Sequence, residues 1–138
     1  MLTVPKSETN YLMIRQEVIY YKVLKGDNLE KVATTFNLNP KTIVWANDEI
    51  IRDELRPDMV IRVPPVDGVI HEVRRDDTTA KIAVIYKVSE KNIKDYPYNN
   101  FIDEDKNIPV IGDTLIVPGG RKNESGILGI FVKKIFNR

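Results

Sequence analysis

The sequence contains no cysteine, and among its 138 residues there is one histidine and one tryptophan. The missing thiols exclude disulfide scaffolds, thiol nucleophiles and cysteine metal sites. No apolar run approaches the roughly 20 residues of a membrane span, and the opening MLTVPKSETN lacks the basic region and apolar core of a secretory signal. The net charge is only +1, so we expect no general attraction to nucleic acid.

Charge of one sign gathers only at the C-terminal end. Residues 18–66 carry seven basic and seven acidic side chains, and residues 67–120 carry seven basic and ten acidic ones. Residues 121–138 carry five basic residues and one acidic residue among apolar ones. This tail could lie on a membrane surface, pack on the rest of the protein, or begin a further domain.

An internal repeat is the main feature that the sequence does have. YYKVLKGDNLEKVATTF (20–36) and HEVRRDDTTAKIAVIY (71–86) show the same order of residue types, fifty positions apart. Further on, Ile61 and Pro64 match Leu115 and Pro118 at an offset of 54, which indicates a four-residue insertion within 97–109 of the second copy. A fixed period indicates one structural unit that has been copied.

Each copy is predicted to fold as strand, helix, helix, strand. Asp27 is expected to cap the first helix, with Glu30 completing a capping box, and Asn39 followed by proline marks the second helix. In the second copy Asp77 and Ser89 take the cap positions. The predicted fold class is therefore α+β, with two βααβ modules, each a two-stranded antiparallel sheet with two helices packed on one face.

The predicted organisation has four parts. They are an N-terminal extension (1–17), a first module (18–66), a second module (67–120) and the basic, apolar tail (121–138).

These patterns resemble the LysM (lysin motif) family. The resemblance is carried by YKVLKGDNLEKVATTF, IVWAN and LRPDMVIRVP in the first copy, and by HEVRRDDTTAKIAVIY, IKDYPYNN and PVIGDTLIVPGG in the second. The pair also looks like the tandem LysM region that precedes zinc metallopeptidase domains in bacterial wall-remodelling proteins. A catalytic domain outside this chain is therefore one partner that the resemblance suggests.

The family resemblance implies non-catalytic binding of glycans that contain N-acetylglucosamine, in peptidoglycan or chitin, at the cell envelope or outside the cell. No cofactor and no metal are implied. In the family the sugar lies between the loop after the first strand and the loop before the last strand. By position, the expected binding residues of the first copy are Gly26, Asp27, Asn28, Leu29, Ile50, Ile51, Arg52 and Asp53. Those of the second copy are Asp76, Asp77, Thr78, Thr79, Phe101, Ile102, Asp103 and Glu104.

Several residues have two readings. Asp27 and Asp77 are expected to act mainly as structural caps, and Trp45 is read as a packing residue rather than a sugar platform. The stretch YPYNNF (96–101) is either a packing plug or an exposed glycan face.

The second copy departs from the family pattern at Asp76 and Thr79, where the first copy has Gly26 and Leu29. We therefore predict that the first module is the better sugar binder. The alternative function is a protein-interaction module that keeps the fold without binding sugar. A hydrolase is not expected, because the sequence has one histidine and no paired acid–base residues on a matched scaffold.

Overall fold

The chain divides into two compact units, Met1–Asp67 and Gly68–Arg138. The computed structural model describes residues 17–50 and 54–122. The predicted N-terminal extension up to residue 16, the tail from residue 123 onward, and residues 51–53 lie outside the described residues.

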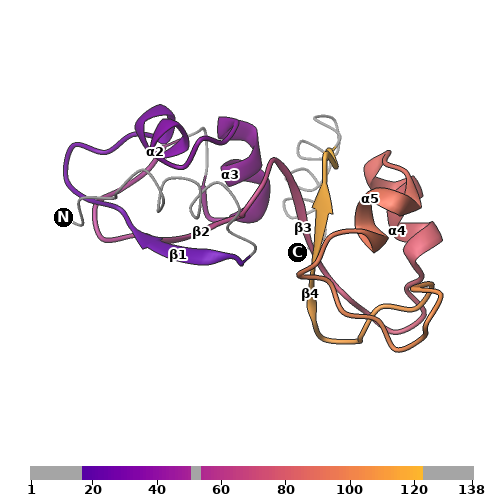
Figure 1. Cartoon of the computed structure of the whole chain (residues 1–138). Helices are drawn as coiled ribbons and strands as arrows, with labels where there is room; N and C mark the ends of the chain where they lie inside the picture. The colour runs from indigo at the N-terminus through magenta and orange to yellow at the C-terminus, as the bar shows by residue number, and fades with distance from the viewer. Residues whose placement is uncertain (1–16, 51–53, 123–138) are drawn as a thin grey trace, which may run out of the picture. The chain divides into compact units, whose positions relative to one another are not determined.

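Unit 1 contains β1 (Ile19–Lys22), α2 (Leu29–Thr35), α3 (Pro40–Ala46) and β2 (Val60–Val63). The strands β1 and β2 pair antiparallel, and both helices lie on one face of this sheet (Figure 1). Branched aliphatic side chains fill the space between sheet and helices. The buried members of this core are Val23, Leu29, Val32, Ala33, Leu38, Ile43, Ile50, Ile61 and Val63.

Unit 2 repeats this order with β3 (Gly68–Glu72), α4 (Thr79–Tyr86), α5 (Glu90–Lys94) and β4 (Thr114–Pro118). The strands again pair antiparallel, with Gly68 opposite Pro118 at one end and Glu72 opposite Thr114 at the other. A β-carbon at Gly68 would come within 2.2 Å of the Val117 carbonyl oxygen, so only glycine fits at this strand start. The predicted α+β fold with two βααβ modules is confirmed.

The second helix of each unit begins where the sequence predicts. Asn39 caps α3 with its side chain and Pro40 follows as the first helical residue. Ser89 caps α5. In both cases a side-chain oxygen accepts from a backbone N–H group that the first helical turn leaves without a partner.

The predicted caps of the first helices are wrong by one residue. Asn28 caps α2 and Thr78 caps α4, and each side chain accepts from the amide three residues on. Asp27 and Asp77 instead bond backward, to the turn that precedes the helix. Glu30 is therefore the second helical residue rather than the third, and it does not complete a capping box.

A buried asparagine holds the last strand of each unit against the second helix. In unit 1 the Asn47 amide donates to the carbonyls of Ile43 and Arg62, and its oxygen accepts from the Arg62 amide. Asn99 makes the same three bonds in unit 2, with Ile93 and Ile116.

These equivalent bonds locate the insertion. The separation from isoleucine to asparagine grows from 4 to 6 residues, and from asparagine to strand from 15 to 17. The four inserted residues are thus two pairs, one on each side of Asn99, and the first pair lies between Ile93 and Asn99. The single insertion predicted within 97–109 is corrected accordingly.

Asp67, the last residue of unit 1, is hydrogen-bonded to the start of α3. The Asp67 carboxylate accepts from the Asn39 amide at 2.7 Å and from the Thr42 hydroxyl at 2.9 Å. The next residue, Gly68, already belongs to β3.

Candidate functional site

The turn after β1 is fixed by its own side chains. Gly26 has a left-handed backbone, with φ of +91°. The Asp27 carboxylate accepts from the Leu24 amide at 2.9 Å and from the Tyr21 hydroxyl at 2.5 Å. The Lys31 ammonium reaches the Gly26 carbonyl at 3.5 Å. The turn therefore presents a bare glycine backbone in a defined conformation.

Unit 2 builds the same turn from different residues. Asp76 replaces the glycine and still adopts a left-handed φ of +70°, which aspartate tolerates better than most residues. The Asp77 carboxylate accepts from the Arg74 amide and lies 2.8 Å from Nε2 of His71. The Lys81 ammonium donates to the Asp76 carbonyl at 3.0 Å. The turn geometry thus survives the change from glycine to aspartate.

Hydrogen bonds lower the pKa of the turn aspartate in both units. In unit 1 the Tyr21 hydroxyl, followed by the Leu24 amide, lowers the pKa of Asp27. In unit 2 burial raises the pKa of Asp77, but the bonds from the Arg74 amide and His71 outweigh burial and leave the pKa below its ordinary value. Both aspartates are therefore set up to remain ionised acceptors within the turn.

The single histidine has two partners in unit 2. Its Nε2 faces Asp77 and its Nδ1 lies 2.7 Å from the Tyr86 hydroxyl. The His71 and Tyr86 rings also meet edge to face, as Tyr21 and Phe36 do in unit 1. Burial raises the pKa of Tyr86. These contacts give His71 a structural role in holding the turn.

The first helical residue points inward in both units. Leu29 is 7% exposed and belongs to the core of unit 1, while Thr79 is 0% exposed. Leu29 therefore offers little side-chain surface to a ligand, and the contribution of both residues to the site lies mainly in the backbone that they carry.

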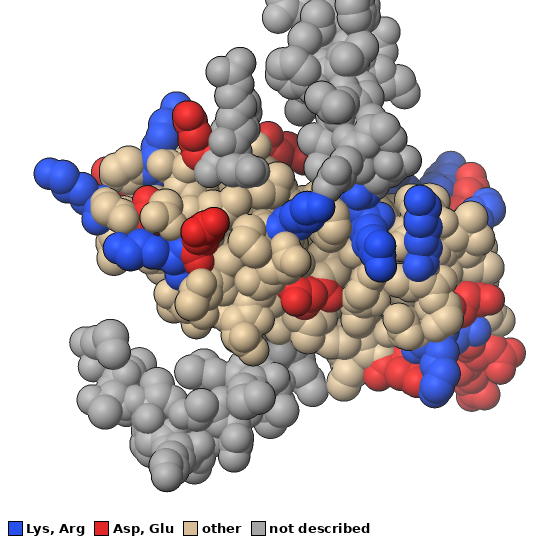
Figure 2. All heavy atoms as spheres, turned by 90° about the horizontal axis from the view of Figure 1, so that it is seen from above, with Lys and Arg blue, Asp and Glu red and all other residues tan. Residues whose placement is uncertain are grey.

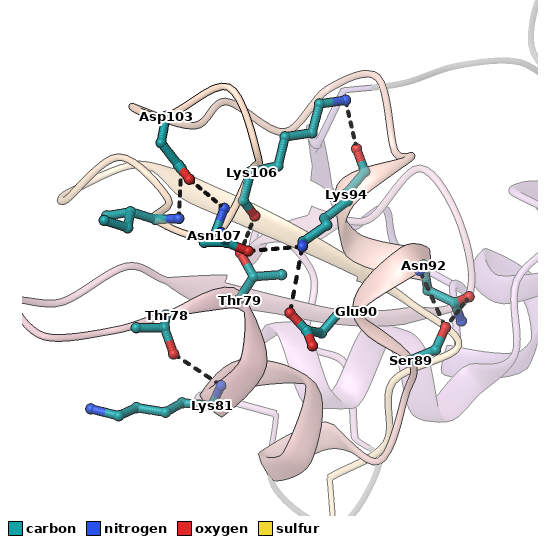
Figure 3. Close-up of polar contacts among 11 residues, drawn as sticks. Thr78, Thr79, Lys81, Ser89, Glu90, Asn92, Lys94, Asp103, Lys106 and Asn107 are labelled. Carbon is teal, nitrogen blue, oxygen red and sulfur yellow. Dashed lines mark hydrogen bonds and ion pairs between the residues drawn. The ribbon is translucent and has the colours of Figure 1, made fainter.

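A hairpin formed by residues 101–109 contacts the first residue of α4 in unit 2. Phe101 bridges Pro109, and the Ile102 amide donates to the Ile108 carbonyl. The Asp103 carboxylate accepts from the Asn107 and Ile108 amides and thereby closes the hairpin (Figure 3). Phe101 and Asp103 are half-buried, and Ile102 and Glu104 are exposed.

Thr79 joins the two loops of unit 2. Its hydroxyl donates to the Lys106 carbonyl at 2.7 Å, and its amide donates to the Asn107 carbonyl at 2.9 Å (Figure 3). Of the predicted residues, Thr79 and the hairpin that carries Asp103 are thus brought together. Lys106 and Asn107 were missed by the sequence reasoning, because the unplaced insertion concealed which hairpin residues meet Thr79.

Two lysines fasten the hairpin to α5. The Lys94 ammonium donates to the side-chain oxygen of Asn107 at 2.9 Å and lies 3.6 Å from Glu90. The Lys106 ammonium donates to the Lys94 carbonyl at 3.0 Å (Figure 3). The hairpin is therefore held in place before any ligand arrives.

In unit 1 the facing loop is described only in part. Ile50 is buried, and its amide donates to the Asn47 carbonyl. The predicted residues Ile51, Arg52 and Asp53 lie outside the described residues. Beyond them Leu55 and Met59 pack against the core.

Charged side chains of both signs occur on the face shown in Figure 2. Among residues 17–50 and 54–122, no group of three histidine, aspartate or glutamate side chains could hold a metal ion. Within the same residues no helix is long and apolar enough to cross a membrane.

Comparison with solved structures finds similar chains in spore cortex-lytic enzymes. The SleL enzyme of Bacillus cereus is 24% identical with a TM-score of 0.33, and the match covers 77% of this chain and 24% of that one. SleL of Bacillus megaterium QM B1551 is 22% identical with a TM-score of 0.36, and the match covers 75% of this chain and 23% of that one. The chain thus spans about a quarter of the length of these structures. Among curated proteins no match was found.

The family model of the LysM domain matches the chain twice, at residues 21–64 and 71–118. Each matched segment contains the last two residues of the first strand of one unit, its left-handed turn, both helices and the whole closing strand. The chain therefore belongs to the LysM family, as a tandem pair of LysM domains.

Proposed function

We propose that this chain binds glycans containing N-acetylglucosamine, such as peptidoglycan, and serves to place an attached or associated protein on the cell wall. LysM domains are non-catalytic modules that generally bind such glycans, and they occur in cell-wall-associated or extracellular proteins. The observation that carries the proposal is the left-handed turn after the first strand, which both units keep with matching hydrogen bonds.

The chemistry of the turn suits an acetamide group. An acetamide offers one N–H donor, one carbonyl acceptor and a methyl group, and backbone groups of an ordered loop can pair with the polar atoms. A shallow site of this kind is expected to bind weakly. Two such sites on one chain raise avidity by up to about 10²–10⁴ where a single glycan spans both.

A specific observation favours a weaker turn site in unit 2. The amide of Thr79, which begins α4 beside the turn, already donates to the Asn107 carbonyl, so it has no second proton to offer an acetamide. The backbone of unit 2 beside the turn is therefore engaged by the hairpin, and we propose unit 1, which keeps Gly26 and Leu29 of the family pattern, as the stronger sugar site.

Co-sedimentation tests the proposed function. The chain should sediment with insoluble peptidoglycan and chitin and release no reducing ends or amines from either. Cellulose, which has the same linkage as chitin but no acetamide, is the control and should leave the chain in solution. Equal sedimentation with cellulose would contradict acetamide recognition, and product release by the purified chain would contradict a non-catalytic role.

A further inference from the structure

We infer that unit 2 carries a second saccharide-contact site, formed by α5 and the end of β4, apart from the turn and its facing hairpin. The inference rests on the proposed function, because the ligand is a pyranose unit of the same glycan. The site is an open hollow of about 450 Å³ lined by Lys91, Asn92, Asp95, Tyr96, Pro97, Pro118 and Gly119. That volume lies within the range of roughly 300–1,000 Å³ found for ligand sites.

The hollow lies at the opposite end of the sheet from the turn. Pro118 pairs with Gly68, the first residue of β3, whereas the turn follows Glu72 at the other end of that strand. Helix α5 separates the two regions. Lys94 extends toward the hairpin, and Asn92 extends from the other side of the helix (Figure 3).

The residues that line the hollow match the two kinds of surface that a pyranose ring presents, one apolar and one polar. One face of the ring presents C–H groups, which pack against flat apolar surfaces such as the half-buried Tyr96 and the neighbouring Pro97. The ring edge presents hydroxyl groups, which need donors and acceptors. The exposed ion pair between Lys91 and Asp95 supplies both. The side-chain NH2 group of Asn92 donates one proton to the Pro118 carbonyl at 3.4 Å and has a second proton to donate.

The equivalent positions of unit 1 carry buried side chains. Thr42, at the position of Asn92, is buried and donates to the Asp67 carboxylate. Pro65, at the position of Gly119, is also buried. In unit 2 glycine replaces this proline, and the chain continues by bonding the Arg121 amide to the Tyr86 carbonyl. Two residues that line the hollow, Asn92 and Gly119, thus take the place of buried residues in unit 1.

A sugar held at this end of unit 2 would give the module a glycan contact that does not depend on the Thr79 amide. This would allow the second module to contribute to avidity even with a weak turn site.

Amide shifts of the full chain during titration with an N-acetylglucosamine tetramer test the inference. The amides of Asn92 and Gly119 should shift together with those around Gly26. Shifts around Gly26 with Asn92 and Gly119 unchanged at saturation would overturn this inference and leave the proposed function in place. A spectrum with no shift anywhere would overturn both.

Variants sharpen the test. Tyr96→Ala should weaken binding of the tetramer at the hollow about threefold to tenfold through loss of the stacking surface. Tyr20→Ala, which removes a tyrosine 71% exposed on β1, is the matched control and should bind like the parent chain. Because Tyr96 is half-buried, Asp95→Asn serves as the second variant, since it removes an exposed carboxylate charge and its ion pair with Lys91 but no buried side chain. Unchanged shifts of Gly119 in both Tyr96→Ala and Asp95→Asn would contradict a site at this place.

Discussion

Asn99 repeats in unit 2 the three hydrogen bonds that Asn47 makes in unit 1, although it stands six residues after its helical isoleucine rather than four. The two side chains are 8% and 2% exposed. The loop has absorbed an insertion on both sides of Asn99 without displacing it. The buried asparagine of each unit is therefore a structural clamp between the second helix and the last strand.

Removal of either clamp should destabilise its own unit. Asn99→Ala removes a donor from the Ile93 carbonyl and takes from the carbonyl and amide of Ile116 the bonds that Asn99 makes with them, and the expected loss is roughly 2–5 kcal/mol. Urea unfolding, with amide hydrogen exchange at Ile116 as the local reporter, measures it.

Asn100→Ala is the matched control for this clamp, because Asn100 is exposed and adjacent. It should change the free energy of unfolding by less than about 0.5 kcal/mol. Equal stability of the Asn99→Ala and Asn100→Ala variants would show that the clamp contributes nothing.

The buried hydroxyl of Thr79 gives a second prediction. Thr79→Val keeps the shape of the side chain but leaves the Lys106 carbonyl without this donor, so unit 2 should lose about 1–3 kcal/mol. Thr79→Ser keeps the hydroxyl and should cost less, roughly the burial of one methyl group, about 1 kcal/mol. Chemical denaturation of the parent chain and the two variants measures their order of stability. A Thr79→Val variant more stable than Thr79→Ser would contradict the bridging role of the hydroxyl.

The turn of unit 1 has a predicted pH dependence. The folded-state pKa of Asp27 is lowered, first by the Tyr21 hydroxyl. Its stabilising effect is therefore fully present above the unfolded pKa of about 3.9 and is lost as the pH falls through the lower folded value.

Tyr21→Phe removes this hydroxyl and should raise the pKa of Asp27. The carboxyl carbon shift, followed by NMR against pH, measures the change, and Asp77 in the same sample is an internal control that should stay the same. An Asp27 titration identical to that of the parent chain would refute the assignment of the shift to Tyr21.

Much of the fold could be predicted from the sequence, because hydrophobic spacing and turn residues act locally. The caps of the first helices could not be placed to the residue. Asp27 and Asn28 are adjacent and both are good cap types. The bonds that the Asp27 carboxylate accepts from the Leu24 amide and the Tyr21 hydroxyl decide between them.

The insertion could not be located for a related reason. Asn99 and Asn100 are adjacent, and either could be aligned with Asn47. The apolar residues that match on both sides are compatible with more than one position of the alignment gap. Which asparagine is buried depends on the distance from α5 to β4, a tertiary quantity. The facing residues Lys106 and Asn107 were missed as a consequence.

Calorimetric titration of the full chain with an N-acetylglucosamine tetramer tests the central claim most directly. A glucose tetramer of the same linkage, which differs at each ring by the missing acetamide, is the comparison. Recognition of the acetamide group predicts measurable binding of the first sugar and much weaker or undetectable binding of the second. Equal affinity for the two tetramers, or no binding of the acetylated one, would contradict it.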